Sequence, residues 1–489
     1  MKKDEENRRP VLSHTVEKIG GTSMSDYAAV RDNIVLKNGK TEDLYNRVFV
    51  VSAYGGLTNL LLENKHNGQP GVYGFFASTD NDASWQEAFT ALRQRVLAIN
   101  SELFGDTELR QQADDFIRQR LDDAERCLSD LQRLCQHGHF ELTSHLFTVR
   151  EMLASIGEAH SAWNMTQLLR RDGVNARFVD LTGWQAEQAE NLDDMIRQQF
   201  ADVDYANELL IATGYTHCSE GLMASFDRGY SEMTFSRIAV LTQAREAIIH
   251  KEYHLSSADP RLVGDSKVVP IGRTNYDVAD QLANLGMEAI HPRAAKGLRQ
   301  AEIPLRIKNT FEPEHRGTLI TGDYVSDTPR VEIIAGRKRV YSVELFDQDM
   351  MGNIDKYDSG ILAVLARFKA HVVSKDMNAN TITHYVAANL KTVKRIREVL
   401  EEKYTGAEIN TRKVAVISAI GSDMKVPGML AKTVSALAEV NISILAMHQS
   451  IRQVDMQFII DEDDYDLAVQ SLHRCLIEVH DHGIAICAA

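Results

Sequence analysis

The sequence has few cysteines and no long apolar run, and these absences argue against zinc-binding, secreted and membrane-spanning proteins. Its 489 residues contain five cysteines, Cys127, Cys135, Cys218, Cys475 and Cys487, in none of the CxxC or Cys/His spacings of a metal site. We therefore expect no zinc site and a reducing compartment. No stretch approaches the ~18 consecutive apolar residues that span a membrane, and the charged start MKKDEENRRP is not followed by the apolar run of a secretory signal. These absences predict a cytoplasmic protein without a membrane partner.

The sequence also has no excess of positively charged residues. The formal net charge is −15, whereas nucleic-acid binders gain much of their affinity by neutralising phosphates with Lys and Arg. The charge therefore argues against a nucleic-acid partner, but it leaves open a small anionic substrate in a locally positive pocket. Hydrophobic residues make up 44% and charged residues 25% of the chain, which is typical of a soluble protein with sizeable cores. At ~150 residues per domain, the length predicts about three domains.

The first two-thirds of the chain alternates strand-like and helix-like segments. Apolar runs at 47–53, 176–180 and 208–215 end in small, polar or glycine residues, and helical stretches cover about 83–134 and 141–171. This alternation is typical of a mostly parallel sheet covered by helices, in which ligands bind at the carboxyl ends of strands. After a tail at 1–13 we expect an α/β domain at 14–325. Its region 83–150 is predicted to be a helical insertion or lid, with a separate functional domain as the alternative.

The last third contains an internal repeat. Sliding the sequence by ~72 residues places AVLARFKAHVV beside SALAEVNISIL. Each copy reads as a ferredoxin-like βαββαβ module, and we expect one at 335–408 and one at 409–489, with return of the final strand to the first module as an alternative. Such modules bind RNA or sense small ligands. The runs VDMQFII and TITHYVA lack the paired aromatics that stack on RNA bases, so small-ligand sensing is favoured.

A glycine pair follows the strand-like start of the segment HTVEKIGGTSMSDY, residues 14–27. Gly20 and Gly21 allow close approach of the backbone to a ligand, and the amides at the start of the next helix attract anions. Thr22 and Ser23 add hydroxyl groups that could cap this helix, and Lys18 is a compact cation suited to phosphate. The Walker pattern is absent. The segment therefore predicts a phosphate-binding loop, and a plain strand-to-helix turn is the alternative.

A second loop of this kind follows the apolar run at 47–53. It contains Ser52, Gly55, Gly56 and Thr58 in VVSAYGGLTNLL. Two glycine-rich loops at strand ends suggest that two anionic groups bind near each other.

Further candidate binding residues follow later in the chain, namely Glu158, Arg228 and Ser231. Glu158 follows Gly157 in a helical context, where a lone glutamate usually belongs to a solvated face. Arg228 and Ser231 lie in a glycine-containing turn before a helix, and an arginine there offers a planar fork that matches a carboxylate.

In order and spacing, these segments resemble the aspartate kinases of the amino-acid kinase superfamily. The family's Lys-Phe-Gly-Gly-Thr-Ser motif reads Lys18-Ile19-Gly20-Gly21-Thr22-Ser23 here. Further matches are Val-Ser-Ala at 51–53, Thr-Asn-Leu at 58–60, Gly-Glu at 157–158, Phe-Val-Asp at 178–180, Thr-Gly-Tyr at 213–215, Ala-Asp-Pro-Arg at 258–261, His-Pro at 291–292 and Gly-Thr at 317–318. Two ACT modules close the chain.

The resemblance implies ATP-dependent phosphorylation of the side-chain carboxylate of L-aspartate, with Mg²⁺ bridging the phosphates. By the same carry-over, the catalytic loop comprises Lys18, Gly20, Gly21, Thr22 and Ser23. Aspartate is implied to bind Ser52, Thr58, Glu158, Arg228 and Ser231, with Arg228 on its α-carboxylate and Glu158 on its amino group. The implied nucleotide contacts are Lys18, Gly21, Ser23, Lys251 and Arg261. No side chain is expected to ligate a metal directly. Phosphoryl transfer depends mostly on positioning and charge stabilisation.

Three positions depart from the family pattern. Its Gly-Arg-Gly-Gly-Ser-Asp turn reads DRGYSE at 227–232, its nucleotide-contacting Thr-Asp falls at His250-Lys251, and a family lysine falls at Glu288. We hypothesise that the cation contacting the ATP phosphates has moved to Lys251. The alternative is that Lys251 and Glu288 are both surface positions. With these features the chain resembles the aspartate kinases found with ectoine biosynthesis genes.

The ACT pair implies dimerisation and regulation by an amino acid. The candidate ligand positions are the turn that contains Met424 and Val426, and the pair Asn441-Ile442, and the alternative is that these residues only build the dimer. Two other functions stay open: a kinase of another amino-acid carboxylate, and an inactive amino-acid sensor.

Overall fold

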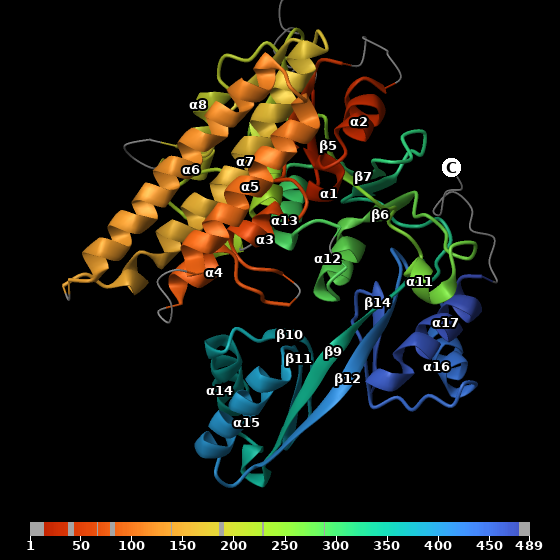
Figure 1. The fold of residues 1–489 in the computed structure, drawn as a ribbon. Coiled ribbons are helices and arrows are strands. Elements are labelled where there is room, and N and C mark those ends of the chain that lie inside the picture. Colours follow the sequence, from red (N-terminus) through yellow and green to blue (C-terminus); the bar gives the residue numbers. More distant parts are fainter. Residues whose placement is uncertain are drawn as a thin grey trace, which may run out of the picture. The chain divides into compact units, whose positions relative to one another are not determined.

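A computed structural model of the chain describes residues 14–37, 44–65, 67–78, 84–137, 139–184, 190–226, 229–287 and 289–478. It separates into two compact units, which are described in turn (Figure 1). The first unit takes the chain up to His254 and returns at 291–319, and the second unit takes 255–290 and everything after 319. Among the described residues, no helix is both long enough and apolar enough to cross a membrane.

The first unit is built on a parallel sheet. Six of its strands run in the order β3 (Ala176–Val179), β4 (Leu209–Thr213), β2 (Arg47–Val51), β1 (Thr15–Ile19), β5 (Glu246–Lys251) and β7 (Leu305–Asn309), and all neighbouring pairs are parallel. Every residue of β1, β2 and β4 is buried, as expected for strands covered on both faces. The α/β architecture predicted from the alternation of apolar runs and helices is confirmed.

Helices of the first unit surround this sheet. Three long ones, α5 (Ser84–Phe104), α6 (Glu108–Cys135) and α7 (Leu146–Arg171), lie side by side (Figure 1). Helix α7 is buried on nearly all sides, which is typical of a helix in the centre of a large domain. The remaining elements are α1 (Gly21–Met24), α2 (Tyr27–Ala29), a π-helix at Val30–Val35, α3 (Leu57–Leu61), α4 (Val72–Ala77), a 3₁₀ turn at Leu142–Ser144, α8 (Leu192–Gln199), α9 (Leu222–Phe226), α10 (Tyr230–Leu241) and α13 (Pro292–Gln300).

The second unit contains one antiparallel sheet of six strands. Their order is β10 (His371–Met377), β11 (Thr381–Ala387), β9 (Ile333–Phe346), β12 (Glu408–Ile420), β14 (Asp455–Asp461) and β13 (Ala446–Gln449). The long strands β9 and β12 pair along both halves of their length, so the two sequence repeats share a single sheet. The segment 479–489, to which the returning final strand was assigned, lies outside the described residues.

Four helices pack on this sheet, namely α14 (Ile354–Arg367), α15 (Leu390–Lys403), α16 (Met429–Ala438) and α17 (Tyr465–Leu476). The unit also contains α11 (Pro260–Val263), β6 (Arg273–Asn275) and α12 (Tyr276–Asn284), with 3₁₀ turns at Gln348–Met350 and Glu462–Asp464, while β8 (Thr318–Thr321) crosses the boundary between the units. Ala258, before α11, and Val263, the last residue of α11, belong to the same apolar core as residues of α16 and α17.

Candidate active site

The predicted site residues of the first unit gather at the carboxyl edge of its parallel sheet. In the strand register, Ile19 at the end of β1 is paired with Val51 of β2 and His250 of β5, and Val51 is paired with Thr213 of β4. The loops that follow these strands therefore start side by side. This is the edge at which parallel sheets bind ligands.

The two glycine-rich loops are locked together at this edge. A Cβ at Gly21 would lie 2.6 Å from the carbonyl oxygen of Ala53, so only glycine allows this approach. Across the same contact, the Gly55 amide donates to the Ser25 hydroxyl at 2.9 Å, and the Ser52 amide donates to the Ile19 carbonyl at 3.1 Å. The two loops therefore lie against each other, and the prediction that they bind two neighbouring anionic groups stays a prediction.

The hydroxyl groups of the first loop have different surroundings. Gly20 is the N-cap of α1 and no side chain caps this helix, so the prediction that Thr22 or Ser23 caps it is wrong, because both residues lie within its single turn. Ser23 is buried and shares a 2.9 Å hydrogen bond with the hydroxyl of Thr310, whereas Thr22 is exposed. Of the two, Thr22 is the hydroxyl that a ligand can reach.

Lys18 is a buried cation beneath this loop. It is 7% exposed, and its Nζ lies 3.8 Å from Oε1 of Glu232 on α10. Burial lowers the pKa of Lys18, and the charge of Lys251 lowers it further, while Glu232 and Glu158 oppose this shift. The other carboxylate oxygen of Glu232 accepts the His291 amide at 2.5 Å. Sequence reasoning noted Glu232 as a departure but did not assign it to the site.

Glu158 faces the site from α7 and is not on a solvated face. It is 2% exposed, and a Cβ at Gly214, just after β4, would lie 2.8 Å from its Oε2. Burial raises the pKa of Glu158 to about 8, against the opposing effects of Lys18 and of hydrogen bonds from Tyr230 and from the Ala53 and Tyr215 backbone. Among the described residues, Oε2 has no hydrogen-bond partner. A buried acceptor with spare capacity is suited to a charged donor on a ligand.

Two tyrosines that sequence reasoning did not assign to the site, Tyr215 and Tyr230, form hydrogen bonds to Glu158. Tyr230 is 3% exposed, and its ring packs edge-on against that of Tyr215 with 5.7 Å between centroids. The Tyr215 hydroxyl donates to Glu151, which also accepts the Met223 amide at 2.7 Å. Tyr230 stands where the family pattern has glycine, so the resemblance could not have predicted this contact.

Arg120 connects the long helix α6 to the same edge of the sheet. Its side chain is 7% exposed, pairs with Asp180 and donates to the Thr182 hydroxyl at 3.0 Å. The guanidinium carbon lies 4.7 Å from the centroid of the Phe116 ring and 5.3 Å from that of Trp184. Arg120 therefore fixes the loop that follows β3.

This loop in turn fixes the loop that follows β4. The Leu181 amide donates to the Thr213 hydroxyl at 3.0 Å, and that hydroxyl donates to the Tyr215 carbonyl at 2.9 Å. The His217 amide donates back to the Leu181 carbonyl at 2.8 Å. Because the Tyr215 backbone also bonds to Glu158, a continuous set of hydrogen bonds joins α6 to the acidic side of the site.

A buried charged cluster lies directly under the glycine loop. Glu17 of β1 accepts two hydrogen bonds from Arg47 of β2, at 2.6 and 2.9 Å, and a third contact from His250 of β5 at 2.8 Å. Burial alone would raise the pKa of Glu17, but Arg47 and His250 hold it well below its ordinary value. Arg47 also donates to the Ile34 and Val35 carbonyls. Glu17 thus ties three strands together, with His250, one of the departures from the family pattern, as its partner on β5.

The other predicted residues of the first unit lie around this edge. Ser52, Thr58 and Ser231 are half-buried or buried in the loops and helices described above, and Lys251 is half-buried at the end of β5. Arg228 and Glu288 lie outside the described residues. Within the described residues, no group of three or more His, Cys, Asp or Glu side chains could hold a metal ion. The edge therefore combines backbone amides, Lys18 and Lys251 for an anion with Glu158 for a cationic group.

The remaining predicted residues belong to the second unit. Arg261 is the second residue of α11, is exposed, and pairs with Asp259 at 3.2 Å. Met424 and Ile442 are buried in an apolar core, and Asn441 is exposed with φ 57°. Val426 lines a cavity of about 290 Å³ at the start of α16, together with residues that include Arg330 and Lys432. Only one of the four predicted regulatory positions therefore lines this cavity.

Comparison with known proteins gives consistent results. The model of the amino acid kinase family matches residues 14–309, and a model of the ACT domain matches residues 417–476. Aspartate kinase Ask_Ect of Stutzerimonas stutzeri is 59% identical over 97% of this chain and 100% of its own length. Aspartokinase 1 of Bacillus subtilis is 28% identical over 66% of this chain and 81% of its own.

Solved structures show the same fold. Aspartokinase III of E. coli, in complex with aspartate and ADP, has a TM-score of 0.69 and 20% identity, covering 95% of this chain and 99% of that one. The aspartate kinase of Clostridium acetobutylicum has a TM-score of 0.67 and 20% identity, covering 94% of this chain and 100% of its own.

Proposed function

The chain belongs to the aspartate kinases of the amino acid kinase family, and we propose that it transfers the γ-phosphoryl group of ATP to the side-chain carboxylate of L-aspartate. The product is 4-phospho-L-aspartate. The observation that carries this proposal is the pairing, at one sheet edge, of a buried Lys18 under two interlocked glycine loops with a buried Glu158 that has spare acceptor capacity. Lys18 and the loops can bind the phosphates, and Glu158 can bind the ammonium group of the amino acid.

In the transfer step, a carboxylate oxygen of aspartate forms a bond to the γ-phosphorus. The bond from that phosphorus to the bridging β–γ oxygen breaks, and its electron pair leaves with ADP. Lys18 and the backbone amides of the Gly20–Ser23 loop stabilise the negative charge on the transferring group. When bound, Mg²⁺ would neutralise further phosphate charge, and the absence of a carboxylate cluster among the described residues fits a metal carried mainly by the nucleotide.

Aspartate is positioned by groups around Glu158. We assign Arg228 to the α-carboxylate from the family motif, with Ser52, Thr58 and Ser231 as further donors. Glu158 takes the ammonium group, and since its pKa is about 8 in the free protein, aspartate binding near neutral pH should displace a proton from it. Lys251 is assigned to the ATP phosphates, because its charge acts on Lys18. A Lys251→Ala variant should therefore show a raised KM for ATP, and an unchanged KM would leave Lys251 as a surface residue.

The deciding experiment traps the product as its hydroxamate. Purified protein is incubated with ATP, Mg²⁺, L-aspartate and hydroxylamine, beside Lys18→Ala and the matched variant Lys296→Ala, whose lysine is exposed on α13. We expect hydroxamate from the wild type and Lys296→Ala only. ATP binding without hydroxamate would favour another carboxylate substrate. Loss of both would favour the amino-acid sensor.

We also propose a pathway, an oligomeric state and a regulatory ligand for this kinase. The name Ask_Ect of the relative that is 59% identical supports a role in supplying ectoine synthesis. We propose a cytoplasmic homodimer that associates through its ACT modules, and an amino-acid ligand at the turn around Val426, whose cavity supports that assignment. Light scattering after size-exclusion chromatography would measure the oligomeric state.

A further inference from the structure

A second buried carboxylate, Glu151, lies on the helix that carries Glu158. It precedes Glu158 by seven residues on α7, which is about two helical turns, so the two side chains leave the helix on the same face. Glu151 is 6% exposed. The sequence motifs assigned no role to this residue, although a buried carboxylate is costly unless its oxygens are hydrogen-bonded.

Each oxygen of Glu151 accepts a hydrogen bond from a different segment. Oε2 accepts the Tyr215 hydroxyl in the loop after β4, and Oε1 accepts the Met223 amide in α9 at 2.7 Å. Burial and the charge of Glu151 raise the pKa of Tyr215, so the phenol stays protonated and donates. Glu151 thus joins two segments that lie eight positions apart in the sequence.

A glycine between these two segments packs directly on the same face of α7. Gly221 has φ 68°, and a Cβ there would lie 3.3 Å from Oε1 of Glu151 and 3.0 Å from Cε1 of Phe147. Phe147 precedes Glu151 by four residues, so it lies one turn away on this helix. The close approach of the Gly221 backbone therefore brings the Met223 amide within reach of the carboxylate.

The first segment forms the ammonium side of the aspartate site. The Tyr215 backbone bonds to Glu158, and the Tyr215 ring packs against that of Tyr230, which also bonds to Glu158. A Cβ at Gly214 would lie 2.8 Å from Oε2 of Glu158 and 2.7 Å from Cβ of Ser231. A displacement of Tyr215 would therefore disturb the hydrogen bonds of Glu158 and the packing of Ser231 together.

The second segment leads to the turn assigned to the α-carboxylate. Helix α9 ends at Phe226, two residues before Arg228. The Phe226 ring lies edge-on to that of His291 with 5.9 Å between centroids, and a Cβ at Gly229 would lie 2.6 Å from Cδ2 of His291. The chain on both sides of Arg228 is thus fixed, and the bond of the Met223 amide to α7 is the first of these fixed points.

We propose that Glu151 is a positioning residue that holds both charged sides of the aspartate site in place. Its carboxylate fixes Tyr215 and Met223 relative to α7, and so relative to Glu158. Glu151 lies about 10 Å from Glu158 along the helix axis, so it acts through these partners and not on the substrate. Small displacements of binding groups weaken a substrate contact strongly. This inference rests on the proposed binding of L-aspartate by Glu158 and Arg228.

Steady-state kinetics of Glu151→Gln tests this role. Glutamine keeps the size of the side chain but removes its charge and one acceptor oxygen. We therefore expect the KM for L-aspartate to rise about tenfold, with kcat within about threefold of the wild type and the KM for ATP unchanged. A KM for L-aspartate that stays at the wild-type value, or a parallel rise of both KM values, would overturn the proposal.

Tyr215→Phe separates the two contacts of Glu151. It removes only the hydroxyl contact and should raise the KM for L-aspartate about threefold. In that background Glu151→Gln should raise the KM further, because the Met223 amide loses its charged acceptor, but the combined rise should stay below the product of the two single effects. A double variant no worse than Tyr215→Phe would overturn the part assigned to Met223, and a strictly multiplicative rise would overturn the part assigned to Tyr215.

Glu246→Gln is the matched control. Glu246 is the first residue of β5, at the end of the strand away from the site, and it accepts a hydrogen bond from Arg306 at 2.7 Å with its side chain 22% exposed. Both KM values should stay at the wild-type level in this variant. Thermal melting of every variant measures its folding, so a loss of stability is recognised separately from a change in KM.

The kinase reaction and the role of Glu151 fail in different ways. Absence of hydroxamate from the wild type would overturn the reaction itself. A wild type that forms hydroxamate, beside a Glu151→Gln variant with an unchanged KM for L-aspartate, would overturn only the role of Glu151.

Discussion

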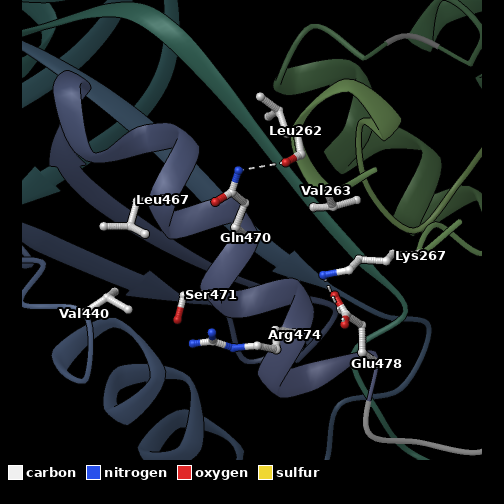
Figure 2. Close-up of a pocket in the computed structure, with 9 residues that line it drawn as sticks. All are labelled: Leu262, Val263, Lys267, Val440, Leu467, Gln470, Ser471, Arg474 and Glu478. Carbon is white, nitrogen blue, oxygen red and sulfur yellow. Dashed lines mark hydrogen bonds and ion pairs between the residues drawn. The ribbon is translucent and has the colours of Figure 1, made fainter. Parts of the chain in front are cut away.

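Two sets of charged groups, one in each unit, differ in how deeply they are buried. At the sheet edge of the first unit, Lys18 and Glu158 are 7% and 2% exposed, and the Glu17–Arg47 pair beneath them is equally buried. In the second unit, the side chain of Lys267 is 54% exposed and its contact with Glu478 is 3.8 Å long (Figure 2). The first set is fixed by the protein itself, whereas the second pair is partly solvated.

This difference has a physical consequence for function. Charges that are already desolvated and oriented stabilise a transition state without reorganising when the reaction occurs. Exposed charges are screened by water and salt, and they gain strength only when a ligand excludes that water. Substitutions should therefore have large effects at the first unit's buried edge and small ones among the second unit's exposed pairs, unless a ligand is bound.

The strongest test of this difference removes one arginine from a buried ion pair and one from an exposed ion pair. Arg47→Met leaves Glu17 buried with Thr15 and His250 as its remaining hydrogen-bond partners, and it leaves two backbone carbonyls without the arginine donor. We expect a loss of about 3–5 kcal/mol in the free energy of unfolding. Arg412→Met in the second unit breaks a pair with Asp461 whose side chains are 54% and 43% exposed, and should cost about 0–1 kcal/mol. Urea denaturation measures both, and equal losses would contradict the comparison.

Glu158 provides the next largest effect. Glu158→Gln keeps the shape of the side chain but removes the charge that receives the substrate's ammonium group. We expect kcat/KM for L-aspartate to fall on the order of 100-fold, mainly through KM, since a buried charged contact is lost. Glu208→Gln is the control, because Glu208 precedes β4 at the opposite end of the strand. A normal KM in Glu158→Gln would exclude the assigned contact.

The pH dependence of aspartate use tests the same carboxylate more finely. The pKa of Glu158 is about 8 because the group is buried; below that pH it is protonated and cannot receive a cation. We therefore expect kcat/KM for L-aspartate to rise with pH through about pH 8 and to level off about one unit above it. Tyr230→Phe removes a hydrogen bond that favours the ionised form, so the rise should move to higher pH.

The control for this profile is Tyr205→Phe. Tyr205 stacks on His14 at the start of β1, with 4.1 Å between ring centroids, so it lies away from the carboxyl edge. Its profile should match that of the wild type. A profile of the Tyr230→Phe variant that coincides with both would show that this hydroxyl does not act on Glu158.

The sequence could predict the site residues that lie at or near the ends of strands. Apolar runs that end in small residues identified β2, β3 and β4, and the motif order brought Lys18 and Glu158 to one edge, because parallel strands in register place their carboxyl ends together. The sharing of one sheet by the two repeats could not be predicted, since β9 and β12 each run on through both halves of it.

The contacts that the sequence could not predict join residues far apart in the chain. Tyr230 reaches Glu158 across 72 positions, and Arg120 reaches Asp180 across 60. Neither follows a local pattern: Tyr230 replaces a glycine of the family motif, and Arg120 lies in a helix whose many arginines are mostly in exposed pairs. Only the packing of α6 against the loop after β3 distinguishes Arg120 from its neighbours.

Arg120 also provides the smallest predicted effect, because it acts on the site through two loops. Arg120→Gln should raise the KM for L-aspartate about three- to tenfold, as expected for loss of a partly exposed charged contact of about 1 kcal/mol, while the KM for ATP stays near the wild-type value. Arg118→Gln is the matched control on the same helix, with a side chain 41% exposed. Arg120→Lys should restore part of the effect by pairing with Asp180. If both KM values rise together, or if lysine gives no recovery, Arg120 only stabilises the helix packing and does not position the substrate site.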